Sequence, residues 1–371
     1  MTFERIRRLT ASEAWSDAIL PTITVRIVLM LTALLAVIVF RPDALGSAPL
    51  LGIWDRWDAP HFFEVAAHGY GPPSDPARIV LFPLYPLAIA VGSLVLDPLA
   101  SGMLVSFVAT VAAAVGLQRL VRFDDSRPAA RAAVIAMLVF PTAFAFVAPY
   151  SESLFLALAV WSFVRARDGD WRGAGVLGAL AALTRLQGAF LVPALAIEYW
   201  HQRRRVERDA AWVAVIGLGL VGYLGVNFVT FGDPLYFMQV QRQTFAVANV
   251  PPWQALGNLW TGLTTATLGE FWATVYLAPA LAFLALAGGS VWSLASRRSR
   301  PSYAVYALVS LIAFASLNWP ISVPRYALGV FPVFMAVGSV SRRPGGVAVI
   351  VGSVLLLAIC LTLFVIGHWA F

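Results

Sequence analysis

The sequence predicts an all-α polytopic membrane protein that forms one integral domain over residues 1–371. Of these residues 60% are hydrophobic and only 12% are charged, which leaves too little polar surface for a soluble domain of this size. Apolar runs of membrane-spanning length follow one another along the chain, and neither a repeat nor a long linker divides it. No signal-peptide cleavage pattern follows the first apolar run, so we expect this run to remain as an anchor.

The positive charge predicts the orientation of the chain in the membrane. The formal net charge is +7 and the sequence contains no lysine, so every basic side chain other than histidine is an arginine. Arg5, Arg7 and Arg8 place the N-terminus in the cytoplasm, and the run from about 22 to 40 then crosses outward. We therefore interpret the charge as a topology signal with affinity for anionic membrane lipids, and not as a nucleic-acid site. The following five arginine-bearing loops are expected to be cytoplasmic: 119–131, 165–172, 201–208, 297–300 and 342–343.

Two segments need special treatment in this topology. Two apolar runs, 79–96 and 101–118, lie between the first external loop and the basic loop at 119–131, yet only one of them can cross. The sequence LFPLYPL (81–87) carries two prolines that remove backbone donors, so the first run is predicted to lie at the interface or to dip back. The run 173–200 has basic loops at both ends and is predicted to form two half-helices broken at TRLQG (184–188).

These assignments predict about eleven transmembrane passages, a large first external loop, an internal N-terminus and an external C-terminus. Besides the run 22–40, the segment 101–118 and the half-helix pair, the predicted spans are 132–148, 152–165, 210–230, 271–294, 303–317, 326–341 and 346–366. The polar loops without an arginine cluster then fall on the external side. They are residues 54–70, APYSES (148–153), the segment 232–254 and NWPISVPRY (318–326).

The first external loop, WDRWDAPHFFEVAAHGY (54–70), concentrates ionisable side chains among aromatic ones. Asp55 and Asp58 are three residues apart and would share a face of a short helix. A carboxylate such as that of Asp58 can act as the general base that deprotonates an acceptor hydroxyl, and His61 follows one helical step later. The alternative interpretation is an interfacial aromatic belt, including Trp57, with solvated charges between the rings.

Three further residues are candidates for the same site. Glu152 is a second candidate acid, although a charge that favours the helix dipole is the alternative. Arg185 lies at membrane depth, where an arginine indicates function unless it forms a structural ion pair. Arg325 follows two prolines at an external helix start, where its planar fork can bind a lipid phosphate, the alternative being a side chain that reaches a headgroup.

The remaining candidates have supporting roles or none. No histidine has a partner at the spacing of a zinc ligand, so we predict neither a metal nor another cofactor. His68 and His201 are interpreted as surface residues and His368 as a tail residue, while the single cysteine, Cys360, lies in an apolar run and excludes an internal disulfide. The candidate supporting residues are Asp55, Trp57, Tyr150 and Tyr326.

The motif WDAPHFFEVAAHGY resembles the WDA-x-HF-x-x-IA-x-x-GY signature of the PIG-V mannosyltransferases, whose bacterial members are relatives of GPI mannosyltransferase 2. Five later blocks resemble the same family in the same order, and together they span most of the chain. These blocks are FPLYP (82–86), FPTAFAFVAPYSESLF (140–155), LTRLQG (183–188), GDPLYF (232–237) and PRYALGVFP (324–332).

The resemblance implies a GT-C-type glycosyltransferase in a bacterial cell membrane, with its active site on the external face. It also implies a polyprenyl-phosphate sugar donor, with mannose as the preferred sugar, and it places the catalytic base at Asp58. Arg325 and Arg185 would bind the donor phosphate, and direct displacement would invert the anomeric centre. The acceptor, which is a glycan, a lipid or a protein, is not specified.

A polytopic transporter or lipid flippase is the alternative class. In a transporter Arg185 and Glu152 would be charges of the transport pathway, and the half-helices would form a substrate site. That class predicts inverted repeats and charges in both halves of the chain. The sequence shows no such repeat, and most candidate residues gather on one predicted side, so we favour the glycosyltransferase.

Overall fold

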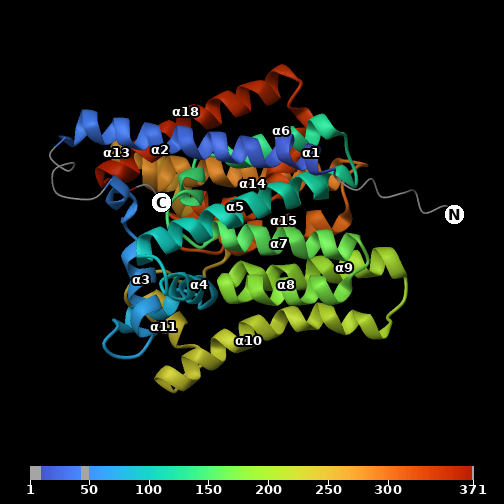
Figure 1. Cartoon of the computed structure of the whole chain (residues 1–371), viewed down its shortest axis with the longest axis horizontal. Helices are drawn as coiled ribbons and strands as arrows, with labels where there is room; N and C mark the ends of the chain where they lie inside the picture. The colour runs from blue at the N-terminus through green and yellow to red at the C-terminus, as the bar shows by residue number, and fades with distance from the viewer. Residues whose placement is uncertain (1–9, 43–49, 370–371) are drawn as a thin grey trace.

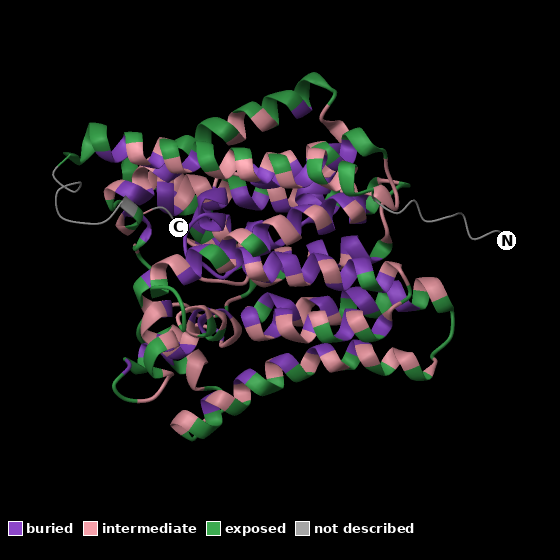
Figure 2. Ribbon diagram, viewed as in Figure 1, coloured by how far each residue is buried: buried purple, intermediate pink, exposed green. Residues whose placement is uncertain are grey.

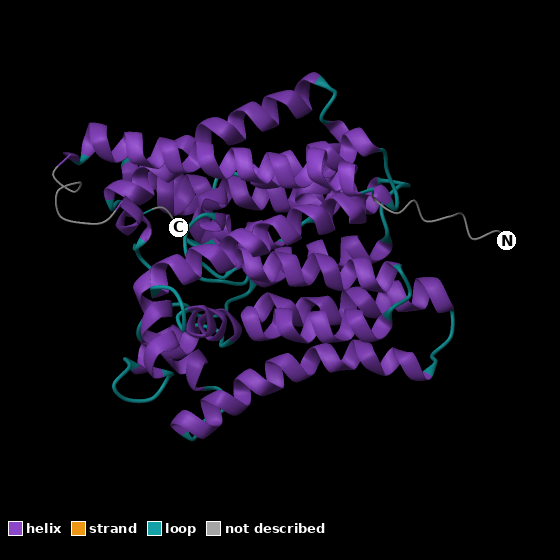
Figure 3. Cartoon of the chain, viewed as in Figure 1, coloured by secondary structure: helices purple, strands orange, loops and turns teal. Residues whose placement is uncertain are grey.

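The computed structural model describes residues 10–42 and 50–369, and these residues fold almost entirely into helices (Figure 1). The described residues form no strand, and their sole β-type pairing is an isolated bridge between Asn249 and Leu317 (Figure 3). The predicted all-α class is therefore confirmed. Arg5, Arg7 and Arg8, which predict an internal N-terminus, lie outside the described residues.

The first span is one continuous helical rod from Ala11 to Phe40. It begins with a capping box, in which Thr10 and Glu13 satisfy each other's free backbone donors, and it includes one π-helical turn. The rod is made of α1 (Ala11–Ala14), the π-turn η1 (Trp15–Ile19) and α2 (Leu20–Phe40), in agreement with the predicted span at 22–40.

Four short helices precede the second span. They are η3 (Leu50–Trp54), α3 (Ala59–His68), η4 (Pro76–Val80) and α4 (Leu84–Gly92), and α3 lies within the predicted first external loop, 54–70. With 9 residues, α4 is about 14 Å long and cannot cross a hydrocarbon core of about 30 Å. Figure 1 shows α4 end-on, whereas α5, α7 and α8 run across the view. The prediction that the proline-containing segment does not cross is consistent with this length and direction.

The body of the protein is a bundle of longer helices. Five helices of the described residues are long and apolar enough to cross a membrane, or six if the pair 323–329 and 332–340, bent by 79°, counts as one span. The number of about eleven passages therefore stays a prediction. The helices of the bundle are α5 (Pro98–Arg122), α6 (Arg127–Leu138), α7 (Glu152–Arg167), α8 (Trp171–Thr184), α9 (Leu191–Arg203), α10 (Ala211–Phe231), α14 (Ala278–Ala295), α15 (Pro301–Phe314), α16 (Val323–Tyr326), α17 (Pro332–Val340) and α18 (Pro344–Ile366).

Three predicted segments differ from the structure. The expected span 326–341 is broken, because the segments 323–329 and 332–340 meet at a bend of 79°. The expected span 132–148 ends early, because α6 stops at Leu138 and residues 139–151 form turns and the short 3-10 helix η5 (Ala143–Phe146). The expected loop 232–254 contains the helix α11 (Tyr236–Gln243). Further short helices follow this loop on the way to α14, and they are α12 (Pro252–Thr265), α13 (Glu270–Trp272) and the π-turn η8 (Ala273–Leu277).

The half-helix pair predicted for 173–200 is confirmed. The helix α8 ends at Thr184, Arg185 is extended with φ −158° and ψ 149°, and η6 (Leu186–Phe190) leads into α9. Gln202, near the end of α9, donates a hydrogen bond of 3.0 Å to the carbonyl of Ala166, at the end of α7. The chain has therefore returned to the end of the bundle at which α8 began.

Ion pairs bring the arginine-bearing loops together at this same end. Arg119 pairs with Asp168 at 2.7 Å, and Arg298 pairs with Asp125 at 3.0 Å. Gly338, shortly before the loop at 342–343, packs directly against the backbone of α6. The gathering of the five basic loops at one end is confirmed, and the assignment of that end to the cytoplasm stays a prediction.

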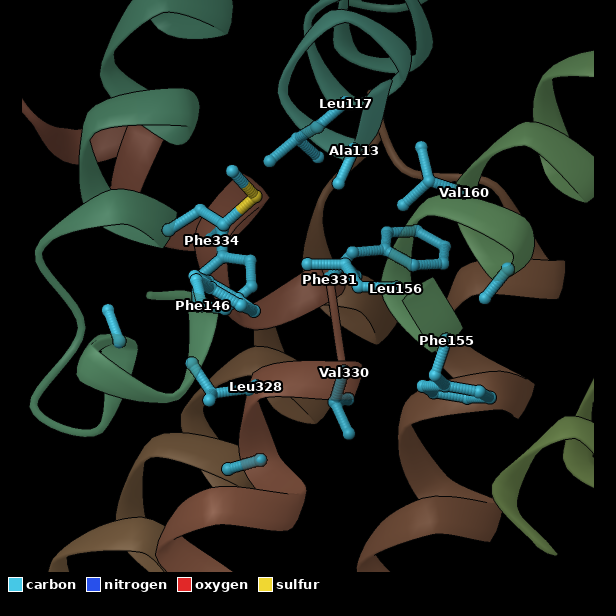
Figure 4. Close-up of a cluster of buried hydrophobic side chains, with 14 of the residues drawn as sticks. Ala113, Leu117, Phe146, Phe155, Leu156, Val160, Leu328, Val330, Phe331 and Phe334 are labelled. Carbon is cyan, nitrogen blue, oxygen red and sulfur yellow. The ribbon is translucent and has the colours of Figure 1, made fainter. Parts of the chain in front are cut away.

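The hydrophobic core lies along α5 and α7, whereas α10 and α18 expose much of their surface (Figure 2). Figure 4 shows Phe331 between Leu156 and Val160 of α7 and Ala113 and Leu117 of α5. Its ring also stacks on that of Tyr306, with centroids 5.3 Å apart. This packing fixes the segment that follows α16, and therefore the position of α16 itself.

Candidate active site

Asp58 lies at the start of α3 with its carboxylate directed away from the helix. It is the N-cap residue, and its backbone carbonyl accepts hydrogen bonds from the amides of His61 and Phe62. Its side chain caps no amide of α3; instead, Oδ2 lies 2.6 Å from Nη2 of Arg325. Trp57, directly before it, has φ 55°, a left-handed conformation that is uncommon for a bulky residue and that turns the chain into the helix.

Glu152 is the first residue of α7 and is buried, with a side chain only 3% exposed. Its Oε1 lies 2.8 Å from Nη1 of Arg185 and 2.8 Å from Nε of Arg325. The first contact is an aligned hydrogen bond, whereas the second is an ion pair by distance alone. A carboxylate buried this deeply needs such partners, because an unpaired charge in the interior is strongly destabilising.

The two arginines come from the two breaks in the bundle. Arg185 occupies the extended residue between the half-helices, and its Nη1 also donates to the hydroxyl of Ser151 at 2.9 Å. Arg325 lies in α16, the single turn before the bent helix α17. Both guanidinium groups reach the same oxygen, Oε1 of Glu152.

Two tyrosines complete the cluster. The guanidinium carbon of Arg325 lies 5.0 Å from the ring centre of Tyr150, and that of Arg185 lies 5.2 Å from the ring centre of Tyr326. Such cation–π contacts stabilise the arginines without consuming their hydrogen-bond donors. Burial, together with the charge of Asp58, raises the pKa of Tyr150 well above its ordinary value, so the phenol is neutral and donates to the carbonyl of Arg56 at 3.2 Å.

Ion pairs connect four side chains in the order Asp58, Arg325, Glu152 and Arg185, and we call this set the ionic cluster. Two carboxylates and two guanidinium groups alternate along it. The exposed fraction of the side chain is 31% for Asp58, but it is 11% for Arg325 and 15% for Arg185. Asp58 is therefore the member of the cluster that a molecule arriving from outside meets first.

Three candidate residues of the first external loop lie around this cluster. The helix α3 begins only at Ala59, so the expectation that Asp55 and Asp58 share a helix face is wrong, and Asp55 is exposed. Trp57 packs edge-on against Trp369, with ring centroids 5.2 Å apart. Burial, followed by the charge of Arg78, lowers the pKa of His61 below its ordinary 6.5, although the charge of Asp58 acts in the opposite direction.

Arg26, which was not among the residues predicted from the sequence, holds the segment that leads to Tyr150 and Glu152. Arg26 lies in the middle of α2 and donates to the carbonyls of Phe146 and Met103 at 3.1 and 3.0 Å. A third donation reaches the carbonyl of residue 147 at 3.4 Å. The carbonyls of residues 146 and 147 lie in the irregular segment that follows the early end of α6, whereas that of Met103 belongs to α5. The sequence does indicate a special role for this residue, since Arg26 is the one charged residue in the apolar run 22–40.

Residues 80–226 match the family described as dolichyl-phosphate-mannose-protein mannosyltransferase, a range that includes Glu152 and Arg185 but neither Asp58 nor Arg325. Over 94% of the chain the fold is similar to 56% of the apo oligosaccharyltransferase of Archaeoglobus fulgidus, with a TM-score of 0.52 and 13% sequence identity. The protein therefore has a helical fold similar to that of this oligosaccharyltransferase, as expected from the sequence.

Curated relatives define the resemblance further. The chain is 35% identical to GPI alpha-1,6-mannosyltransferase 2 of Mus musculus over 153 residues, which are 38% of this chain and 30% of the relative. It is 33% identical to the enzyme of the same name from Cricetulus griseus over 189 residues, which are 43% of this chain and 37% of the relative. The chain thus spans about a third of the length of these relatives. The resemblance to mannosyltransferases stated from the sequence is confirmed.

Proposed function

We propose that this protein transfers a sugar, mannose by resemblance, from a polyprenyl-phosphate donor to an acceptor hydroxyl, with inversion of the anomeric centre. The observation that carries the proposal is the pairing of Asp58 with Arg325 at 2.6 Å. This pair brings together a candidate base and a candidate phosphate ligand, the two groups that the reaction needs. The ionic cluster supplies them without any nucleotide site.

The reaction would proceed by direct displacement. The acceptor oxygen attacks the anomeric carbon, and Asp58 takes the proton of the hydroxyl. The bond between the anomeric carbon and the phosphate oxygen breaks, and its electron pair leaves with the polyprenyl phosphate. Arg325 and Arg185 stabilise the charge on that phosphate, while Glu152, buried between them, holds their guanidinium groups in position.

The ion pair between Asp58 and Arg325 suggests an order of events. A donor phosphate that binds the guanidinium of Arg325 replaces Asp58 as its partner. The carboxylate, which is the most exposed member of the ionic cluster, then becomes free for the acceptor hydroxyl. His61, one turn along α3, is placed to position Asp58 or the acceptor, and its lowered pKa favours the neutral imidazole in that role.

The test uses the full chain in membranes. Radiolabelled polyprenyl-phosphate mannose is supplied with candidate glycan, lipid and peptide acceptors, and the configuration of the new linkage is determined. We expect transfer with inversion and no transfer from a nucleotide mannose in the matched reaction. Retention of configuration, or use of the nucleotide sugar alone, would contradict the proposal.

The ionic cluster is proposed to face the outside of a bacterial cell membrane, because it lies at the end of the bundle opposite the basic loops. Labelling of single cysteines with a membrane-impermeant maleimide tests this orientation. In a Cys360→Ser background, Asp55→Cys in the first external loop should react in intact cells. Arg205→Cys, whose native side chain is 78% exposed, should react only after lysis. The opposite pattern would place the site in the cytoplasm.

A further inference from the structure

A large apolar groove lies along the outer side of α7, and the proposed reaction makes no use of it. Its volume is about 690 Å³, within the range of roughly 300 to 1,000 Å³ that small-molecule sites occupy. The walls come from α5, α7 and α8. The residues that define its course are Leu104 and Val108 of α5, Leu154, Leu158 and Arg165 of α7, and Leu177 of α8.

The groove is separate from the ionic cluster. The groove residues Leu154, Leu158 and Arg165 follow one another at helical spacing and form a single stripe of α7. At roughly 100° per residue, Glu152 lies about 200° from Leu154, on the opposite side of the helix. The groove and the ionic cluster therefore lie on opposite sides of α7. A lipid donor whose phosphate contacts Arg185 and Arg325 would not place its hydrocarbon chain in this groove.

The dimensions of the groove fit an extended hydrocarbon chain. From Leu154 to Arg165 the stripe rises about 16 Å, roughly half of a hydrocarbon core of about 30 Å. Val108 and Leu104 are 58% and 50% exposed, so the groove opens sideways toward the membrane. The indole of Trp161 donates to the carbonyl of Ala112 at 2.8 Å, which fixes the bottom of the groove near Arg165.

The charged end of the groove indicates the kind of lipid. The side chain of Arg165 is 49% exposed and lies 3.5 Å from Asp170, whose carboxylate also caps α8 by accepting from the amide of Gly173. A second guanidinium, that of Arg119, lies 5.9 Å from the ring centre of Trp161; it pairs with Asp168 at 2.7 Å and its side chain is 33% exposed. Cations at the mouth of an apolar channel complement a lipid with a negatively charged headgroup.

We propose that this groove binds an anionic phospholipid, with an acyl chain along α7 and the headgroup phosphate on Arg165. The headgroup lies at the end of the bundle that carries the basic loops, and the acyl chain runs from there along α7 toward Leu154. The binding does not depend on the proposed glycosyl transfer. The groove lies directly between α5 and α7, the two helices that build the core. A bound chain would therefore support the packing on which the position of Glu152 depends.

Native mass spectrometry of the full chain in detergent tests the proposal, with phosphatidylglycerol and phosphatidylcholine added in equal amounts. Wild-type protein should retain phosphatidylglycerol preferentially. Arg165→Gln should reduce this preference about fivefold, the contribution expected of one arginine near an anionic headgroup. Val108→Trp, which fills the groove from its exposed side, should reduce the retention of both lipids.

Matched variants outside the groove separate this site from general membrane contact. Arg205→Gln removes an arginine of another basic loop, and Leu218→Trp adds the same ring to α10 at a position that is 61% exposed. Both should retain the lipids as the wild-type protein does. Equal retention of the two lipids by wild-type protein, or an unchanged preference in Arg165→Gln, would overturn the proposal, as would equal losses in Val108→Trp and Leu218→Trp.

Discussion

Nη2 of Arg325 lies 2.6 Å from Oδ2 of Asp58, although Asp58 belongs to the predicted first external loop and Arg325 to the helical turn α16, more than 250 residues later. This contact joins two regions that neither the family match at 80–226 nor local sequence spacing connects. It converts two separate candidates into one site. The following predictions test what each member of the ionic cluster contributes.

Replacement of Asp58 by Asn removes the proposed base but keeps the size of the side chain. Turnover should fall by a factor on the order of 100 to 10,000 if Asp58 takes the acceptor proton. Folding should survive, because Arg325 keeps Glu152 as a partner. Steady-state transfer measured at saturating donor gives the change in turnover.

The matched control for this variant is Asp55→Asn, which neutralises the exposed carboxylate three residues earlier. It should have a mild effect, because Asp55 lies outside α3 and is exposed. His61→Ala should be intermediate. Near wild-type turnover in Asp58→Asn would remove Asp58 as the base and make Glu152 the next candidate.

Glu152 and Arg185 form a buried pair whose two members should differ in their effect on stability. Glu152→Gln leaves two guanidinium groups facing each other, and we expect the free energy of unfolding to fall by about 3 to 5 kcal/mol. Arg185→Ala should cost less, because Glu152 still pairs with Arg325. Thermal unfolding in detergent, alongside transfer activity, measures both effects.

Transfer activity and thermal unfolding together distinguish a donor-binding role of Arg185 from a structural one. If it contacts the donor, Arg185→Ala should lose most transfer activity while the protein level stays near that of the wild type. If Arg185→Ala and Glu152→Gln lose folded protein to the same extent and the remaining protein is fully active, Arg185 has a structural role only.

All four residues of the ionic cluster were candidates from the sequence, but the contacts between them were not predicted. Composition and arginine spacing sufficed for the helical class and for the break at Arg185, because charge and proline act locally on a membrane helix. Asp58 and Glu152 followed from residue type and resemblance. The pairing of Arg325 with both carboxylates could not be predicted, because it depends on how segments far apart in the sequence pack together.

The sequence did not predict that α6 ends at Leu138, because this break also depends on contacts with a distant segment. Residues 139–148 are apolar and look like part of a span, but they form turns whose carbonyls need donors from elsewhere. Arg26 supplies those donors from α2. An apolar run alone does not reveal such a break, whereas a lone arginine in a neighbouring span indicates that unpaired backbone lies nearby.

Replacement of Arg26 by Met should therefore loosen the segment that precedes Glu152. Each buried carbonyl left without a donor costs about 1 to 3 kcal/mol, so the midpoint of thermal unfolding should fall. Transfer should fall as well, because the same segment carries Tyr150. Arg26→Lys should recover part of both losses, since an ammonium reaches fewer of the three carbonyls than the guanidinium does. This role would be contradicted if Arg26→Met and Arg26→Lys lost the same amount of transfer activity while the midpoint of thermal unfolding stayed at the wild-type value.

His61 should make the folded protein sensitive to mild acid. Its pKa is lowered in the folded state, chiefly by burial and then by Arg78, while Asp58, Glu64 and Asp75 act in the opposite direction. The unfolded chain therefore binds the proton first as the pH falls. The stability that His61 contributes is complete above its ordinary pKa of 6.5 and is lost as the pH falls through the lower, folded value.

The measurement compares the thermal midpoints of wild-type protein and His61→Gln between about pH 7.5 and pH 5, the range around the ordinary histidine pKa. The wild-type midpoint should fall more steeply below pH 6.5 than that of the variant. His68→Gln, which changes an exposed histidine of the same helix, serves as the control and should follow the wild-type curve. Parallel curves for wild type and His61→Gln would contradict the prediction.

The final prediction concerns the donor. Arg325 presents a planar fork that can hold a phosphate by two parallel hydrogen bonds, whereas lysine offers a point charge. Arg325→Ala should weaken binding of the donor and of polyprenyl phosphate as an inhibitor by a factor on the order of 100, typical for loss of one charge-stabilising donor. Arg325→Lys should recover only part of that loss. Arg78→Lys is the matched control, because Arg78 pairs with Glu64 at 2.7 Å in the first external loop and lies outside the ionic cluster. If Arg325→Ala binds polyprenyl phosphate as tightly as the wild type, Arg325 only positions Asp58 and Glu152, and the donor phosphate must be held by Arg185.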